Sequence, residues 1–537
     1  MTVKQLDAIV VGAGFAGVYM LHKLKGLGLD VQVLETAGGI GGTWFWNRYP
    51  GARCDIESME YSYQFSDDLQ QQWEWSEHYA TQSEILSYIE HVADRFDLRG
   101  NIQLNTRVEA AHFHESTSRW AVTTSDGSEF DAKYVIMATG CLSSTNLPDF
   151  DGLQSFRGDW YHTGNWPHEP IDFSGKRVAV VGTGSSGIQC IPLIAEQADH
   201  LTVFQRSPNF SIPAHNQPLD PERVRDIKAN YRSFREANSQ TAFHANFGYN
   251  EANAMDVSAA ERESEYEQRW AHGGLPFLAS FADLIFDGEA NETAAEFVRG
   301  KISDIVEDAA TAELLSPTSV VGCKRLCVDT NYYATFNRSD VSLVDVNRTP
   351  IEAITPAGLR TSEATYEFDA IVFATGFDAM TGALMKIDIR GSAAQSLQDA
   401  WAEGPKTYLG LAISGFPNLF TITGPGSPSV LTNMLPSIEH HVNWIAECIT
   451  FVDQRGLARI NAKANAQADW VEHVNEVGNT SLYPNCNSWY LGANIPGKPR
   501  VFMPYLGFPP YAEKCKHVAD NDYEGFELGL AEPMIRS

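Results

Sequence analysis

"DAIVVGAGFAG", residues 7–17, places a short apolar run directly before a glycine-rich turn and the start of a helix. Gly12, Gly14 and Gly17 follow the spacing G-x-G-x-x-G, in which glycines permit a tight turn and let a pyrophosphate approach the helix N-terminus. The next apolar run, "VQVLE", ends in Glu35, whose carboxylate can accept a hydrogen bond from a ribose hydroxyl. Strand, spacing and terminal acid together favour a dinucleotide site over a glycine turn in an unrelated α/β fold.

A second copy of this pattern lies in the middle of the chain. "KRVAVVGTGSSG", residues 176–187, is followed by the run "LTVFQR", which ends in Gln205 and Arg206 instead of an acid. A guanidinium at this place can pair with a 2′-phosphate, so the sequence predicts NADPH here; the alternative is that Arg206 is an ordinary solvated charge. The residues expected to bind this second cofactor are Gly182, Thr183, Gly184, Ser185, Ser186, Gln189, Arg206 and Ser207.

Two dinucleotide sites with different terminal residues predict FAD in the first and NADPH in the second, with hydride transfer to the flavin. Several classes of flavoprotein have this arrangement. Disulfide reductases need a redox-active cysteine pair soon after the first strand–helix–strand unit, whereas "GGTWFWNRYPGARCDIES" offers only Cys54. That class is therefore disfavoured.

The order of the strand-like runs predicts that the two domains are interleaved. "YVIMATG", ending at Gly140, and "AIVFATG", ending at Gly376, indicate that the chain returns to each sheet. Between them, a segment rich in Glu, Ala, Arg and Asn has helical spacing. We expect an α/β fold with two interleaved Rossmann-type dinucleotide-binding domains and a helical insertion. The expected boundaries are 1–145 and 377–537 for the FAD-binding domain, 146–212 and 318–376 for the NADPH-binding domain, and 213–317 for the insertion.

Composition limits the partners that this chain can have. A formal net charge of −29 repels polyanions, which argues against nucleic acid and anionic membranes as partners. The start of the chain has no basic segment before its apolar run, so we expect neither a signal peptide nor a membrane span. Eight cysteines without a C-x-x-C pair suit a reducing compartment. We therefore expect a cytoplasmic protein, and a monomer.

The cysteines and histidines do not suggest a metal site. Cys323 and Cys327 lie four residues apart, and His440 and His441 are adjacent. Neither pair belongs to a spaced set of three or four ligands. No metal is predicted.

Two longer motifs carry a family resemblance. Phe156, Gly158, His162 and Trp166 with the following proline match F-x-G-x-x-x-H-x-x-x-W-(P/D), and "GGTWFWNRYPGARCD" at residues 41–55 matches a second signature. With these motifs the chain resembles the type I Baeyer–Villiger monooxygenases, and it looks closest to the phenylacetone monooxygenase branch. Similarity continues through "CKRL", "GPGSPSVLTNMLPS" and "SWYLGANIPGKPRVFM".

This resemblance implies a reaction. The enzyme would use NADPH to reduce FAD, and dioxygen would then give a flavin peroxide that attacks a ketone, inserting one oxygen atom beside the carbonyl to form an ester or lactone. Arg325 matches the family's active-site arginine, and Asp55 would orient it near the flavin. A fixed cation suits a developing negative charge. The alternatives are that Arg325 is a surface charge and that Asp55 caps a helix, since "DIES" has nearly the spacing of a capping box.

The resemblance also assigns cofactor and substrate residues. Lys324 would join Arg206 at the 2′-phosphate. Trp489 would lie in a loop that closes over NADP and the pocket, or would be a tail aromatic packed for stability. Leu431 and Met434, just before a helix expected from about Pro436, could form an apolar substrate wall or simply belong to the core. His162, in the linker motif, would act as a hinge between two cofactors without touching substrate, although the motif's aromatic residues could equally pack a domain boundary. The residues expected around the flavin are Gly12, Gly14, Gly17, Glu35, Thr43, Trp44, Asp55, Tyr61, Arg325 and Met434.

Two other functions remain open at this point. A flavin monooxygenase that oxidises soft nitrogen or sulfur would share both cofactors. A non-catalytic flavoprotein that responds to NADPH through domain motion would share the folds. Arg325 with Asp55 favours ketone oxidation over the first alternative, and the complete oxygenase signature weighs against the second.

Overall fold

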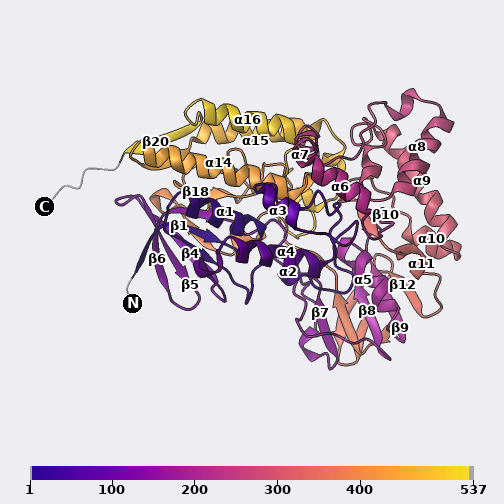
Figure 1. The fold of residues 1–537 in the computed structure, drawn as a ribbon. Coiled ribbons are helices and arrows are strands. Elements are labelled where there is room, and N and C mark those ends of the chain that lie inside the picture. Colours follow the sequence, from indigo (N-terminus) through magenta and orange to yellow (C-terminus); the bar gives the residue numbers. More distant parts are fainter. Residues whose placement is uncertain (1–2, 531–537) are drawn as a thin grey trace.

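The computed structural model describes residues 3–530 and contains two sheets of the nucleotide-binding type (Figure 1). The first sheet has the order β17-β4-β5-β6-β1-β2-β3, and β18 pairs with β6. Strands β1, β2, β3, β6 and β18 pair in parallel, while β4 and β5 form an antiparallel extension. Its strands are β1 Lys4–Val11, β2 Val31–Leu34, β3 Ile102–Gln103, β4 Val108–His114, β5 Arg119–Thr124, β6 Glu129–Met137, β17 Asp388–Arg390 and β18 Leu419–Thr421.

The second sheet has five parallel strands in the order β12-β9-β8-β16-β7. Its strands are β7 Asp159–His162, β8 Arg177–Val181, β9 His200–Gln205, β12 Val341–Asp345 and β16 Ala370–Phe373. Between β12 and β16 the chain forms an antiparallel sheet of β13 Ile351–Thr355, β14 Gly358–Thr361 and β15 Thr365–Glu367. The first sheet contains strands from before and after the whole second sheet, and the strands of the second sheet lie on both sides of the helical insertion. The predicted α/β fold with two Rossmann-type domains that share the chain in this interleaved way is confirmed. The predicted boundaries within 3–530 stay a prediction, and residues 1–2 and 531–537 of the expected FAD domain lie outside the described residues.

The chain passes between the two sheets twice, and the two passages touch. Thr145 and Phe377 form an antiparallel bridge, and the backbone N–H of Asn146 donates to the carbonyl of Gly376 at 2.9 Å. We call these two passages, residues 141–146 and 376–380, the interdomain crossing. Part of the aromatic motif of the sequence is not a free linker but the edge strand β7, in which His162 pairs with Phe373 of β16.

The helices divide into three groups (Figure 1). Those of the first domain include α1 and α14, which pack together through the hydrogen bond from Tyr19 Oη to Asn443 Oδ1, at 2.9 Å. Helix α5 follows the second glycine turn. Helices α6 to α10 lie within the predicted insertion, and α8, α9 and α10 are seen at the right of Figure 1. The helices are α1 Phe15–Gly26, α2 Thr43–Trp46, α3 Asp67–Gln72, α4 Gln82–Arg95, α5 Ser185–Ala195, α6 Pro221–Ala229, α7 Tyr231–Ser239, α8 Ala259–His272, α9 Gly288–Ile305, α10 Ala309–Leu315, α11 Tyr332–Thr335, α12 Gly382–Met385, α13 Leu397–Ala400, α14 Met434–Gln454, α15 Ala464–Asn479 and α16 Phe508–Asp520.

Short strands complete the insertion and the C-terminal region. β10 Ser211–Pro213 pairs with β11 Cys327–Asp329 in parallel, directly before and after the insertion. β19 Leu457–Ala462 pairs with β20 Phe526–Leu530 in antiparallel fashion. The insertion therefore leaves and returns at one place, beside the segment that carries Arg325.

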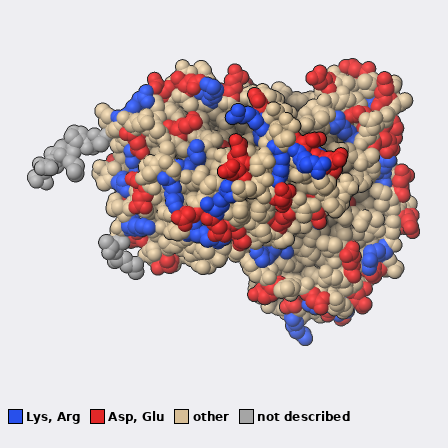
Figure 2. Space-filling view, viewed as in Figure 1, with Lys and Arg blue, Asp and Glu red and all other residues tan. Residues whose placement is uncertain are grey.

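Charges on the face shown in Figure 2 are interspersed, with Lys and Arg lying among Asp and Glu. Within residues 3–530, no helix combines the length and apolar character needed to cross a membrane. Cys323 and Cys486 form a disulfide although 163 residues separate them, a pairing that the cysteine spacing does not predict. The other cysteines are buried thiols.

Candidate active site

The first glycine turn leaves no room for side chains. Gly12 has φ +105°, and a Cβ on it would lie 2.6 Å from the carbonyl oxygen of Ala138 in the neighbouring strand connection. A Cβ on Gly17 would lie 1.8 Å from the carbonyl oxygen of Gly12. The turn between β1 and α1 therefore requires glycine at both positions, and it directs the N-terminus of α1 at the space where a pyrophosphate would lie.

Glu35 follows β2 and is almost fully buried. Its Oε2 accepts from the backbone N–H of Ala13 at 2.6 Å, and its Oε1 accepts from that of Ala37 at 2.7 Å. Burial raises the pKa of this carboxyl, although the backbone donors oppose the shift. Because a carboxylate has about four acceptor sites, Glu35 can still accept from a ribose hydroxyl while it holds the turn.

The second signature covers the first glycine turn. Gly42 has φ +55°, and its Cβ would lie 2.9 Å from the Cα of Gly14. Thr43 then begins α2 and is exposed, whereas Trp44 is buried and donates from Nε1 to the hydroxyl of Tyr61 at 3.1 Å. The predicted flavin residues of this segment therefore lie together over one nucleotide fold.

The second glycine turn repeats the first but remains open. Gly182 has φ +112°, and a Cβ on it would lie 2.4 Å from the carbonyl oxygen of Ala374. A Cβ on Gly187 would lie 2.3 Å from the carbonyl oxygen of Gly182. By contrast, nothing lies within 4 Å of a Cβ on Gly184. Ser185 is exposed and Ser186 is half-buried at the start of α5. Open space at a helix N-terminus is what an incoming pyrophosphate requires.

Two cations converge beside this turn. Arg206 follows β9 and is exposed, while Lys324 is half-buried. Burial lowers the pKa of Lys324, and the nearby guanidinium of Arg206 lowers it further. Thr183 fixes the local backbone by donating from its hydroxyl to the carbonyl of Ser207 at 3.0 Å. Two neighbouring positive charges beside a dinucleotide turn can pair with a 2′-phosphate, so these residues suit NADPH.

Gln189, predicted to bind cofactor, connects the two domains in this structure. Its Oε1 accepts from the hydroxyl of Tyr49 at 2.8 Å, and its Nε2 donates to the carbonyl of Arg53 at 3.2 Å. Gly51, with φ +82°, approaches α5 so closely that a Cβ would lie 2.5 Å from the carbonyl oxygen of Gln189. The second signature thus packs against the helix of the second nucleotide fold.

Arg325 and Asp55 form a bidentate ion pair between the domains. Arg325 Nε donates to Asp55 Oδ2 at 2.8 Å, and Nη2 donates to Oδ1 at 2.9 Å. Nη1 donates to the carbonyl of Val430 at 2.9 Å, and the guanidinium carbon lies 4.9 Å from the ring centroid of Phe243. The pair joins the second signature, the segment after the insertion, and the turn before α14.

The electrostatics of this pair keep the arginine charged. Burial acts to lower the pKa of Arg325, but the charge of Asp55 and its hydrogen bonds outweigh this effect and raise the pKa. The alternative of a surface Lys–Arg pair is wrong for Arg325, whose side chain is only 18 % exposed. The helix-cap alternative for Asp55 is also wrong, because the residues after it form bends and turns instead of a helix.

Phe243 and Val430 were missed in the sequence. Phe243 comes from the insertion, far along the chain from Arg325, and nothing in its local pattern marks it. Val430 contributes only its backbone carbonyl, which any residue could supply. A guanidinium with bound carboxylate, carbonyl and aromatic face is held rigidly, as a preorganised cation requires.

Leu431 follows Val430, whose carbonyl binds Arg325, and Met434 is the first residue of α14. The 3-10 turn Ser429–Leu431 holds the carbonyl that binds Arg325, and Asn433 caps α14 by accepting from the backbone N–H of Leu435 at 3.4 Å. Leu431 is buried and Met434 is partly exposed at the first position of α14. Helix α14 begins at Met434 with Pro436 in its first turn, as expected, and its N-terminus carries a partial positive charge.

His162 lies against the interdomain crossing. Its Nδ1 accepts from the backbone N–H of Gly164 at 3.0 Å, and its Nε2 lies 3.3 Å from the hydroxyl of Thr375, which itself donates to the carbonyl of Asn146 at 2.6 Å. Burial lowers the pKa of His162, although a backbone hydrogen bond opposes the shift. Of the remaining motif residues, Phe156 and Gly158 are half-buried and Trp166 is buried.

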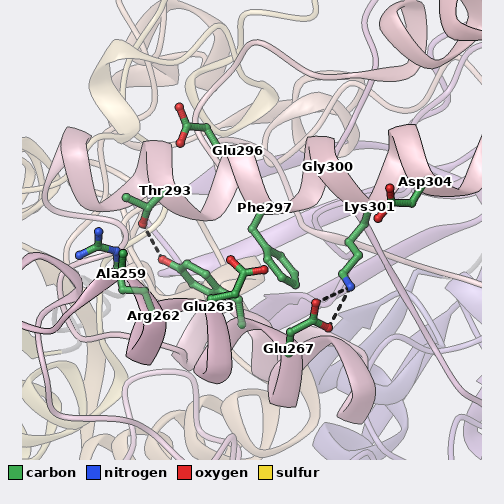
Figure 3. Close-up of a pocket in the computed structure, with 11 residues that line it drawn as sticks. Ala259, Arg262, Glu263, Glu267, Thr293, Glu296, Phe297, Gly300, Lys301 and Asp304 are labelled. Atoms are coloured by element: carbon green, nitrogen blue, oxygen red, sulfur yellow. Dashed lines mark hydrogen bonds and ion pairs between the residues drawn. The ribbon is translucent and has the colours of Figure 1, made fainter.

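A surface groove lies elsewhere, in the insertion. It has a volume of about 390 Å³ and opens between α8 and α9 of the insertion (Figure 3). An ion pair from Lys301 Nζ to Glu267, at 2.6 Å, closes one end, and Tyr266 donates or accepts a hydrogen bond with Thr293 at 2.8 Å. None of the predicted site residues lines it, so the groove is separate from the nucleotide turns.

Two dinucleotide folds that meet at a buried, carboxylate-bound arginine define a two-cofactor oxidoreductase. A model of the family described as "Pyridine nucleotide-disulphide oxidoreductase" matches residues 9–270. A "Baeyer-Villiger monooxygenase" of Pseudooceanicola batsensis is 42% identical, covering 96% of this chain and 95% of its own length. A "Phenazine N-monooxygenase" of Lysobacter antibioticus is 40% identical, covering 97% of each chain. A solved structure, "Oxidized steroid monooxygenase bound to NADP", has a TM-score of 0.94 and 50% identity, covering 98% of this chain and all of the other.

The chain belongs to the family of Baeyer–Villiger monooxygenases. This confirms the predicted family, the enzyme class, and FAD and NADPH as its cofactors. The phenylacetone monooxygenase branch stays a prediction. The non-catalytic alternative is set aside.

Proposed function

We propose that this enzyme oxidises a ketone to an ester or lactone with NADPH and dioxygen, and that Arg325, positioned by Asp55, supplies the cation of the oxygen-transfer step. The bidentate ion pair at the junction of the two nucleotide folds is the observation that carries the proposal. When bound, NADPH would supply the hydride and FAD would supply the dioxygen chemistry, with the first glycine turn holding FAD and the second holding NADPH. One oxygen atom enters the product and the other leaves as water.

The protein's part in this reaction is to hold charge and exclude water. The guanidinium of Arg325 cannot lose its proton, so it stabilises negative charge throughout the cycle without acting as an acid. Asp55, Val430 and Phe243 fix it in place before the substrate arrives. Because its position is fixed in advance, little reorganisation is needed when charge develops.

The cofactor positions follow from the two turns. We assign Gly12, Gly14, Gly17 and Glu35 to FAD, with Thr43, Trp44 and Tyr61 over its reactive part. Arg206 and Lys324 would bind the 2′-phosphate of NADPH, and Thr183, Ser185, Ser186 and Ser207 would surround its pyrophosphate. Gln189 would act by joining the domains. Leu431 and Met434 would form the substrate wall, and Trp489 would cover NADP. Monomeric state and cytoplasmic location remain predictions.

A substrate screen tests this function. The enzyme is incubated with NADPH and cyclic, aryl, long-chain or steroid ketones, NADPH oxidation is followed, and ester or lactone is identified by mass spectrometry. We expect ester with at least one ketone class. Failure of every ketone, with flavin reduced by NADPH at a normal rate, would contradict ketone oxidation.

A second candidate is oxidation at a ring nitrogen. It is favoured by the similarity to a phenazine N-monooxygenase over nearly the full chain. Phenazines and organic sulfides belong in the same screen. An N-oxide or sulfoxide formed with better coupling to NADPH than any ester would favour this second function.

A further inference from the structure

The aromatic ring that covers Arg325 comes from a turn of the insertion. Phe243 lies in residues 240–245, directly after α7, a segment here called the insertion turn. Its neighbour His244 has φ +56°, a conformation that residues other than glycine seldom adopt without support from their surroundings. The position of the ring over the guanidinium therefore depends on what holds this turn.

A single carboxylate oxygen holds both ends of the insertion turn. Oε1 of Glu60 accepts from the backbone N–H of Asn246, just after the turn, at 2.9 Å. The same oxygen accepts from Nδ2 of Asn238, in the last part of α7, at 3.3 Å. Glu60 follows Asp55 closely in the chain. The segment that supplies the carboxylate partner of Arg325 thus also supplies the acceptor for the insertion turn.

The backbone of Glu60 is fixed as well as its side chain. Its carbonyl accepts from Nη1 of Arg235 and from Nδ2 of Asn433, both at 3.0 Å. Arg235 is buried in α7, and its Nη2 donates to the hydroxyl of Ser62 at 2.6 Å. The backbone N–H of Asn433 donates to the carbonyl of Phe243 at 2.8 Å. Phe243 is thus attached to Glu60 by two routes, one through the Glu60 carboxylate and one through the cap of α14.

The chain after Glu60 is attached to α14 in turn. Glu439, a buried residue of this helix, accepts with Oε1 from the backbone N–H of Gln64 at 2.9 Å and from that of Phe65 at 3.1 Å. The segment 60–65, the start of α14 and the insertion turn therefore form one hydrogen-bonded unit beside Arg325.

Glu60 occupies a place that is unfavourable for a charge. Burial raises its pKa to about 7; the backbone N–H of Asn246 opposes this shift, Glu57 increases it, and Arg235 and Arg223 oppose it. A buried carboxyl is costly unless its hydrogen bonds are made. Carboxyls with raised pKa values cluster at functional sites, and the side-chain hydrogen bonds of this one lead to the insertion turn.

We propose that Glu60 is a positioning residue that holds the insertion turn, and thereby the ring of Phe243, over Arg325. The ring face attracts the guanidinium and covers one side of it, so a fixed ring helps to fix the cation before substrate arrives. The inference rests on the proposed role of Arg325 in the reaction, whereas the attachment of the turn to Glu60 is independent of any substrate.

The first test follows the turn itself by hydrogen exchange in FAD-loaded enzyme without ketone. In Glu60→Ala, peptides covering residues 238–247 should exchange about tenfold faster than in wild type, since two hydrogen bonds are lost. Glu60→Gln keeps an acceptor of the same reach and should stay near wild type. Asn238→Ala removes one donor, should give a smaller increase, and carries the test if Glu60→Ala does not fold. The matched control is Glu84→Ala, because the Glu84 carboxylate accepts from the backbone N–H of Ser76 at 2.8 Å, away from this turn.

The second test asks whether Glu60 acts through Phe243. Glu60→Ala and Phe243→Leu should each lower the ester formed per NADPH oxidised, roughly fivefold, while FAD stays bound. The double variant should be no worse than Phe243→Leu alone, because no ring is left to position. Glu60→Gln should restore wild-type coupling.

Two results would overturn the proposal. One is wild-type exchange of residues 238–247 in both Glu60→Ala and Asn238→Ala. The other is a double variant in which the losses of Glu60→Ala and Phe243→Leu multiply, which would show that Glu60 acts independently of the ring. If wild type formed no ester from any ketone, the exchange results would still decide the proposal, and only ketone oxidation would be contradicted.

Discussion

The two glycine turns have nearly the same backbone but differ in what covers them. Gly12 and Gly182 have φ +105° and +112°, and both turns exclude a Cβ at the sixth motif position. At the middle glycine they diverge: Gly14 is packed against Gly42, whereas Gly184 has nothing within 4 Å of a hypothetical Cβ. The first turn is thus covered by the protein itself, and the second is open.

This difference matches the work expected of the two cofactors. A covered turn with a buried acid suits a flavin that stays bound through many cycles. An open turn with two converging cations suits a nucleotide that must arrive and leave, and whose 2′-phosphate is recognised by charge. The motif gives the shape of a dinucleotide site, and the neighbouring residues decide which dinucleotide binds and for how long.

The largest effect is expected where the two sites meet. Arg325→Ala should lower ester formation by about 100- to 1000-fold, the usual loss for one preorganised charge contact. NADPH oxidation should continue and release hydrogen peroxide. Ester yield and peroxide yield are measured together, with Arg338→Ala, an exposed arginine of the second domain, as the control. If Arg325→Ala formed as much ester per NADPH oxidised as wild type, the Arg325–Asp55 pair would not be the reaction centre.

Asp55→Ala should shift the products in the same direction by a smaller factor, because the guanidinium would remain but lose its bidentate partner. If Asp55→Ala proved as severe as Arg325→Ala, a purely positioning role for Asp55 would be wrong.

The next effect tests how the open site recognises its ligand. Arg206→Ala should reduce the preference for NADPH over NADH by roughly 10- to 100-fold, since a charge-assisted phosphate contact contributes about 1.5–3 kcal/mol. Lys324→Ala should act similarly. The measurement is the Michaelis constant of each variant for NADPH and for NADH. An unchanged preference for NADPH would contradict the role of Arg206, in place of an acid such as Glu35, in recognising the 2′-phosphate.

A third pair of variants compares covered and open turns directly. Gly42→Ala places a Cβ 2.9 Å from the Cα of Gly14 at φ +55°, which should cost about 1–3 kcal/mol and loosen FAD. Gly184→Ala meets no atom, so stability should stay within about 0.5 kcal/mol while NADP⁺ binds more weakly. Thermal unfolding and protein-bound flavin absorbance measure both. If the two substitutions destabilised the protein equally, the proposed difference between a covered first turn and an open second turn would be wrong.

The smallest effect concerns communication between the domains. His162→Ala removes hydrogen bonds to Gly164 and Thr375, each contributing about 0.5–1.5 kcal/mol. FAD should stay bound and turnover should fall several-fold. Stopped-flow mixing separates flavin reduction from ester formation. A defect confined to ester formation would indicate that His162 takes part in the chemistry instead of the hinge.

Local patterns predicted the nucleotide folds well. The expected strands before Glu35 and Arg206 are β2 and β9, and the return of "AIVFATG" to the second sheet is β16. These succeeded because strand period, glycine spacing and terminal charge are all local features. The helix predicted from about Pro436 is α14, which begins at Met434 and has Pro436 in its first turn, with Asn433 as its cap.

Contacts between distant segments could not be predicted in the same way. Phe243 over Arg325, Lys498 with Asp378, and the disulfide of Cys323 and Cys486 each join residues without a shared local pattern. Cysteine spacing alone does not determine which cysteines pair. The resemblance assigned Arg325 and Asp55, and the structure supplied the contacts that hold them.

The interleaved topology also bears on how the chain is made. β18 is the last strand to join the first sheet, and it pairs with β6, a strand from before the first passage to the second domain. All strands of the second sheet are synthesised before β18, so that domain can fold while the first sheet still has an unpaired edge on β6. Unpaired edges of this kind favour aggregation and prolong dependence on chaperones. If a ribosome stalled after residue 376, the NADPH-binding domain of the released chain could therefore fold. The FAD-binding domain would be incomplete and prone to aggregate.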